Sequence, residues 1–190
     1  RPMWRFIIYV ATIDFILDMV PYLYILTNGY TYWGPWPEDH PLLLLARAEN
    51  FTSLVLYEVF LAFVCRSETR SMLEQGWKGF TANKMLMYST IVSWVLQFTI
   101  LYTPLAEVFH IAPLPPFWLA VTIIDTCAAF LILPQKLLRA EVTAKYLILF
   151  ALFEVGCTLM LFGSYLHTFS GPMFWIGAII ALLAAREIYL

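Results

Sequence analysis

Long runs of apolar residues, separated by short polar connections, dominate the pattern along the chain. A run of about twenty apolar residues is the length that an α-helix needs to cross the hydrocarbon core of a bilayer. Only a helix satisfies its own backbone polar groups within one segment in lipid, so each run is predicted to be helical. The six runs are Phe6–Leu26, Leu44–Cys65, Met85–Tyr102, Phe117–Leu133, Tyr146–His167 and Pro172–Ala185. The last run is short, which leaves a tilted or re-entrant arrangement open.

Composition agrees with this pattern. The 190 residues are 62% apolar, 17% aromatic and 13% charged, with a mean hydropathy of +0.77. Soluble domains are about 45–50% apolar. We therefore predict an all-α, polytopic membrane helix bundle whose first partner is the lipid bilayer. The net charge of −2, without a basic patch, gives no indication of nucleic acid as a partner.

The basic residues predict the orientation of the bundle. With the N-terminus in the cytoplasm, ten of the eleven basic residues fall on the inner side, and only Arg47 falls on the outer side. The inner residues are Arg1, Arg5, Arg66, Arg70, Lys78, Lys84, Lys136, Arg139, Lys145 and Arg186. Because lysine and arginine accumulate in cytoplasmic connections, six spans with both termini cytoplasmic are favoured.

The connections are short, and they differ in character. Thr27–Leu43, on the outer side, is rich in aromatic residues, proline and glycine, which suits either an interfacial belt or a docking surface for a partner. Arg66–Lys84, on the inner side, is polar and too short for a soluble domain. Prolines in Thr103–Pro116 rule out a continuous helix there. The first residue is Arg1 and no signal peptide is recognisable, so a fragment of a longer chain is one expectation.

Acidic residues inside the apolar runs are the candidate functional residues, because carboxylates are costly in lipid. We single out Asp14, Asp18, Glu58, Asp125 and Glu154. Asp14 and Asp18 are four residues apart and therefore share a helix face. Pro21 follows them, and its missing donor frees the carbonyl of Leu17. Several oxygens of this kind are what a hard cation requires.

Four of these acids have a similar predicted depth. At 1.5 Å per residue, Asp14, Glu58, Asp125 and Glu154 each lie about 10–12 Å from the inner edge of the membrane. One hypothesis is that this layer binds a cation or shares protons within the bundle. The other is that the acids are neutral, or bonded to groups of a partner subunit, because burial disfavours a charge.

Histidines and cysteines indicate no metal site. His40, His110 and His167 fall in outer connections or at the ends of runs, without helical spacing between any two. A pigment ligand at His110 or His167 is an alternative to a solvated interfacial histidine. The three cysteines have neither disulfide nor metal spacing, and we interpret them as packing residues.

One stretch and the segments after it resemble a known family. ARAENFTSLVLYEVFLAFVCRSETRS, from Ala46 to Ser71, resembles the eighth membrane helix of type II P-type cation-transporting ATPases, the calcium-pump group. ILYTPLAEVFHIAPLPPFWLAV is similar to the loop between the ninth and tenth helices of that family. The resemblance covers about residues 46–139. It implies that residues 1–139 form a four-helix module equivalent to the seventh to tenth helices, followed by a two-helix hairpin over residues 140–190.

The resemblance also implies roles for particular residues. Glu58 stands where the family places a ligand of the transported ion, so a bound cation such as calcium is expected. Leu61 stands where the family commonly has an asparagine that completes this part of the site. The DKTGT motif, which carries the phosphorylated aspartate of these pumps, is missing from this sequence. The chain is therefore not expected to hydrolyse ATP by itself.

Two functions remain open from the sequence. The first is a non-catalytic membrane module that supports the ion-binding helices of a cation pump, with the catalytic part of that pump as its partner. The second is a scaffold or assembly subunit of a larger membrane complex, respiratory or photosynthetic, without transport of its own. A six-span transporter acting alone is less favoured, because no internal repeat is apparent.

Overall fold

A helix begins each of the six predicted runs, and in the run Phe117–Leu133 the helix ends before Ile132. The computed structural model describes residues 3–27, 37–138, 144–165 and 170–190. The long helices are α1 (Met3–Thr27), α2 (Pro41–Val64), α4 (Lys84–Tyr102), α6 (Pro116–Cys127), α8 (Ala144–Tyr165) and α9 (Ser170–Tyr189). The fold class is thus confirmed, and α9, with 20 residues, is longer than the run predicted for it.

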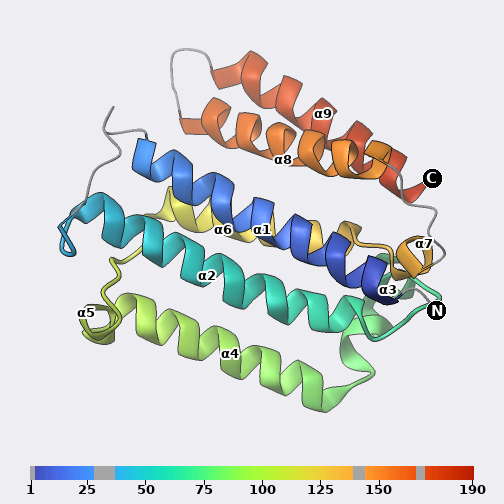
Figure 1. The fold of residues 1–190 in the computed structure, drawn as a ribbon, viewed down its shortest axis with the longest axis horizontal. Helices are drawn as coiled ribbons and strands as arrows, with labels where there is room; N and C mark the ends of the chain where they lie inside the picture. The colour runs from blue at the N-terminus through green and yellow to red at the C-terminus, as the bar shows by residue number, and fades with distance from the viewer. Residues whose placement is uncertain (1–2, 28–36, 139–143, 166–169) are drawn as a thin grey trace.

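The second helix is the centre of the bundle. It packs against α1, α4 and α6, and Figure 1 shows α1 and α4 lying along its two sides. His40 begins the helix, its Nδ1 accepting a hydrogen bond from the backbone N–H of Leu42 at 3.3 Å. Pro41 follows at the first helical position, where its missing N–H costs nothing.

Three short helices occupy the predicted connections. They are α3 (Met72–Thr81), α5 (Leu105–Val108) and α7 (Pro134–Leu138). A reciprocal capping box between Ser71 and Glu74 begins α3. Gly76 then bends it, with φ of 55°, in the left-handed region that favours glycine. Trp77 is 78% exposed beside this bend, as expected for a ring at the membrane interface.

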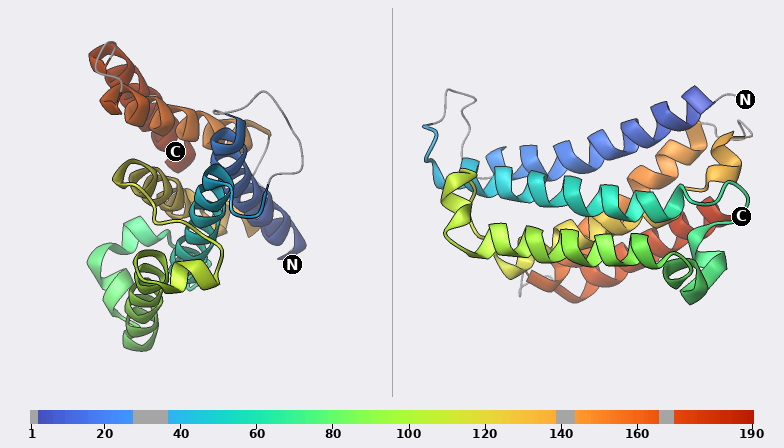
Figure 2. Two further views of the ribbon diagram at one scale, coloured as in Figure 1. Left: turned by 90° about the vertical axis from the view of Figure 1, so that its left-hand side faces the viewer. Right: turned by 90° about the horizontal axis from the view of Figure 1, so that it is seen from below.

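The last two helices form a separate hairpin. Figure 1 and the left view of Figure 2 show α8 and α9 side by side, set off from α4 by the rest of the bundle. Glycine allows their close contact: a Cβ on Gly156 would lie 2.5 Å from the backbone N of Ala181. A Cβ on Gly177 would lie equally close to the carbonyl oxygen of Gly156. Small residues that let two backbones approach in this way are typical of helix pairs in membranes.

Hydrogen bonds fasten this hairpin to the first part of the chain. Tyr146 Oη donates to the carbonyl of Leu131 at 2.8 Å and accepts from the N–H of Leu133 at 3.2 Å. The Nζ of Lys136 donates to the carbonyl of Ile188 at 2.8 Å. The tyrosine contacts satisfy backbone groups freed where α6 passes into the 3₁₀ helix η1 (Ala128–Leu131) and the chain becomes extended at Ile132.

The first and the last described helices begin and end, respectively, at the same end of the bundle. The start of α1 and the end of α9 are next to α3 and α7, whereas α5 is at the opposite end (Figures 1 and 2). Among the described helices, α1, α4 and α9 contain the segments that are long and apolar enough to cross a membrane on length and composition alone. Large apolar side chains are exposed on these helices, including Phe15, Val95 and Leu182. The chain is an integral, multi-pass membrane protein.

Candidate functional site: carboxyl groups within the bundle

The two aspartates of α1 lie on the side that meets α2. Asp18 is 8% exposed, and Asp14, one turn earlier, is half-buried. Helix α1 continues through Pro21, and the amide of Asn50 on α2 donates to the backbone carbonyl of Asp18 at 3.2 Å. This bond goes to the carbonyl next to that of Leu17, the acceptor that Pro21 frees. One carboxyl oxygen of each aspartate is buried without a hydrogen-bond partner.

Glu58 lies on the outside of the described bundle. Its neighbour Tyr57 is 1% exposed, whereas Glu58 itself is exposed. Asp14 and Asp18 are close enough to interact electrostatically with Glu58. The structure thus brings three of the predicted acids, from α1 and α2, to one side of the bundle.

A buried acid that the sequence analysis missed lies on the same helix. Glu49 is fully buried, between Asp18 of α1 and Asp125 of α6, both of which interact with it electrostatically. The hydroxyl of Thr122 lies 3.4 Å from its Oε1, but the single hydrogen of that hydroxyl is shared with the closer carbonyl of Trp118, at 2.9 Å. Glu49 Oε2 has no hydrogen-bond partner. The buried polar residues Glu49, Thr52 and Ser53 share one face of α2, and this was the signal that could have identified Glu49.

A neutral polar contact next to Glu49 joins α2 to α4. Gln97 is 2% exposed and donates from Nε2 to the hydroxyl of Thr52 at 2.9 Å. Thr52 in turn donates to the carbonyl of Ala48 at 2.7 Å. This contact fixes the register of the two helices, but it supplies no charge to a site.

Asp125 and Glu154 form a second group of acids, on the other side of α6. Asp125 is 3% exposed, and its carboxyl interacts with that of Glu154 on α8. Both line a cavity of about 330 Å³ bounded by α1, α6 and α8. The predicted acids therefore fall into two groups, Asp14–Asp18–Glu58 and Asp125–Glu154, with Glu49 between them.

No three histidine, cysteine, aspartate or glutamate side chains within the described ranges are arranged to hold a metal ion. His40 caps α2, and His110 follows α5 with φ of 50°. His167 lies outside the described residues. Cys65, Cys127 and Cys157 are free thiols. A complete cation site would need oxygens beyond those that these residues bring together.

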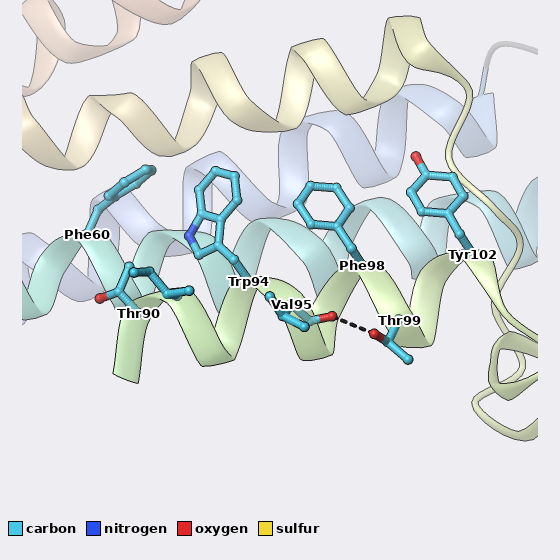
Figure 3. A pocket seen from close by; sticks show the side chains of 8 residues that line it. Phe60, Thr90, Trp94, Val95, Phe98, Thr99 and Tyr102 are labelled. Atoms are coloured by element: carbon cyan, nitrogen blue, oxygen red, sulfur yellow. Dashed lines mark hydrogen bonds between the residues drawn. The ribbon is translucent and has the colours of Figure 1, made fainter. Parts of the chain in front are cut away.

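A groove without an acidic residue in its lining runs along α4. It has a volume of about 880 Å³, and Phe60 of α2 lines it with Trp94, Phe98 and Tyr102 of α4 in a row of rings (Figure 3). At the edge of the groove, the hydroxyl of Thr99 donates a hydrogen bond to the carbonyl of Val95 at 2.7 Å. Because its walls are apolar and its exposed side belongs to a membrane helix, this groove suits lipid chains better than an ion.

The first part of the chain is similar in sequence to known proteins. Residues 1–139 match the family described as "Cation transporting ATPase, C-terminus". The chain is 33% identical over 82 residues to the human "Calcium-transporting ATPase type 2C member 2". It is 40% identical over 58 residues to "Calcium-transporting ATPase 1" of Yarrowia lipolytica.

The matched stretches are a small part of these relatives. They cover 43% of this chain and 8% of the human protein, and 30% of this chain and 6% of the yeast protein. No solved structure matches the chain significantly. The family match ends at residue 139, so α8 and α9 lie beyond it.

Proposed function

The chain belongs to the cation-transporting ATPase C-terminus family, and from this membership we propose that it is a non-catalytic membrane module of a calcium-type pump. In this role residues 1–139 support ion-binding helices that other parts of the pump supply. Residues 140–190 add a membrane hairpin to that module. The catalytic part of the pump is the proposed partner, and Ca²⁺ the proposed cation.

The exposure of Glu58 is the observation that carries this proposal. A carboxylate facing lipid near the middle of a helix costs about 2.5–3.5 kcal/mol on insertion scales. Glu58 lies six residues before the end of α2 and is exposed on the described bundle. A further helix that covers it, or an ion that neutralises it, would remove this cost. Asp14 on the neighbouring helix interacts with Glu58 electrostatically, so both carboxyl groups would face the same added helix.

The charge and geometry of this face suit a partly built cation site. Asp14, Asp18 and Glu58 contribute three carboxyl groups to this face. The basic residues of α1 and α2, Arg5 and Arg47, stand at least nine residues from them along the chain. Hard cations take six or more oxygen ligands. Carbonyl or carboxylate oxygens from the pump's other helices would supply the remainder, and this module would hold its own share in place.

Reconstitution tests the proposal. A type 2C calcium ATPase truncated before its last four membrane helices would be co-expressed with the chain, and ATP-dependent Ca²⁺ uptake measured in vesicles. We expect the chain to restore uptake, and Glu58→Gln to lower the restored uptake at least tenfold. Glu107→Gln, which changes an exposed acid on α5, is the matched control and should restore uptake like the unchanged chain. Failure of a folded, membrane-inserted chain to restore uptake would contradict the proposal.

A scaffold subunit of a larger membrane complex is the second candidate. The hairpin α8–α9 favours it, because a family module that gains two packed helices gains a new surface for assembly. Purification from native membranes separates the two functions. Recovery in a complex that forms no aspartyl-phosphate from ATP would favour the scaffold, whereas co-purification with a phosphorylated subunit would favour the pump module.

A further inference from the structure

The cavity between α1, α6 and α8 combines apolar walls with two acids. Its volume is about 330 Å³, and its walls include Leu17, Tyr24, Trp118 and Leu159. The rings of Tyr24 and Trp118 lie 6.0 Å apart at an angle of 52°. Asp125 and Glu154 are the acidic residues that line it, and the lining contains no lysine or arginine.

One hydrogen-bond donor is missing from this cavity. Asp125 and Glu154 are close enough for their carboxyl groups to interact, and ionised carboxylates are hydrogen-bond acceptors only. The Oε1 of Glu154 is buried, and no donor of the described residues reaches it. Leaving such an acceptor unpaired costs free energy, and a ligand that donates to it would recover that cost.

We propose that this cavity binds a lipophilic primary or secondary amine. Its ammonium group donates to Glu154 Oε1 and balances the charge that remains on the acid pair. Its apolar body fills the space between Leu17 and Leu159. The faces of Tyr24 and Trp118 add attraction for the cation. A quaternary amine has no N–H to donate, and a divalent metal needs more oxygens than two carboxyl groups offer.

This site is independent of the proposed pump function. Asp125 lies within the family-matched residues, whereas Glu154 is on α8, beyond residue 139. The acid pair thus exists only because the added hairpin packs against α6. A chain that fails to support a pump would still contain the cavity.

Photolabelling of the full chain in lipid nanodiscs tests the proposal. The probe is dodecylamine carrying a diazirine on its alkyl chain, and the labelled residues are mapped by mass spectrometry. We expect labels to concentrate on cavity residues of α1, α6 and α8. Unlabelled dodecylamine should compete at least tenfold better than dodecan-1-ol, which has the same chain length and no positive charge.

Three variants make the test specific. Glu154→Gln should lower labelling about tenfold or more, because a charge-assisted hydrogen bond is lost. Val121→Phe fills the cavity without changing an acid and should also abolish cavity labelling. Glu58→Gln removes an exposed acid outside the cavity and should leave labelling unchanged. Equal competition by the alcohol, unchanged labelling of Glu154→Gln, or labels spread over all lipid-facing helices would overturn the proposal.

Discussion

At the scale of single residues, the difference between Glu49 and Glu58 decides how α2 is used. Nine residues separate them, and at about 100° per residue they lie on opposite faces of the helix. Glu49 is fully buried, and Glu58 is exposed. Glu58 was singled out as an acid inside an apolar run that also matches a family position, and Glu49 was missed because it stands near the outer end of the run beside Arg47. Apolar residues surround both faces of a membrane helix, so hydropathy alone cannot distinguish the inward face.

Replacement of Glu49 by glutamine should stabilise the bundle. Glu49 Oε2 is buried without a partner, and an amide removes any charge while offering N–H donors to the neighbouring Asp18 and Asp125. Relief of one unsatisfied buried group is worth about 1 kcal/mol. We therefore expect the thermal midpoint of the chain in detergent to rise by about 2–4 °C.

Glu107→Gln is the matched control for this substitution. Glu107 is the same residue type, but it is exposed on α5, outside the predicted spans, so its replacement should change stability by less than about 0.5 kcal/mol. A fall in the midpoint of Glu49→Gln would mean that the carboxylate is an essential acceptor in the bundle, contrary to our interpretation.

At the scale of helices, the sequence predicted the long elements well and the short ones poorly. Each apolar run became a helix because lipid leaves the backbone no alternative partner. The amphipathic α3 was missed because a polar, glycine-containing segment resembles a loop. Its capping box, Ser71-x-x-Glu74, was nevertheless visible in the sequence. The change from α6 to the 3₁₀ helix η1 was missed as well, since it depends on Tyr146, which lies in the next part of the chain.

The contact between Gln97 and Thr52 should couple α4 to α2. Both side chains are buried and joined at 2.9 Å. A double-mutant cycle with Gln97→Leu and Thr52→Val is expected to give a coupling energy of about 0.6 kcal/mol, and at most about 1.7 kcal/mol, as for hydrogen bonds between membrane helices. The free energies would come from reversible unfolding in mixed micelles.

A second cycle provides the reference for this value. Thr12 on α1 has the same bond to the carbonyl four residues earlier, at 2.7 Å to Ile8, but no bond to Gln97. Thr12→Val combined with Gln97→Leu should therefore be additive within about 0.5 kcal/mol. Equal coupling in both cycles would show that the effect does not arise from the bond between Gln97 and Thr52.

At the scale of the whole molecule, helix directions agree with the distribution of charge. The start of α1, the end of α9, α3 and α7 meet at one end of the bundle (Figures 1 and 2). Arg66, Lys84 and Lys136 belong to the connections at that end, whereas Arg47 is near the start of α2 at the other. The positive-inside rule takes account only of where basic residues stand along the sequence. The arrangement of the helices is an independent argument for the same even number of crossings.

Cysteine labelling should therefore place the two ends of α4 on opposite sides of the membrane. In a background with Cys65, Cys127 and Cys157 replaced by alanine, single cysteines would be introduced as Thr69→Cys, before α3, and Glu107→Cys, on α5. Both positions are exposed. With a membrane-impermeant maleimide on intact cells, we expect the Glu107→Cys variant to react from outside. The Thr69→Cys variant should react only after permeabilisation, because Arg66 and Arg70 favour the cytoplasm beside it.

Reaction of both from the same side would mean that α4 does not cross the membrane. A reversed pattern would move the basic end outward, and the proposed cytoplasmic location of both termini would be wrong.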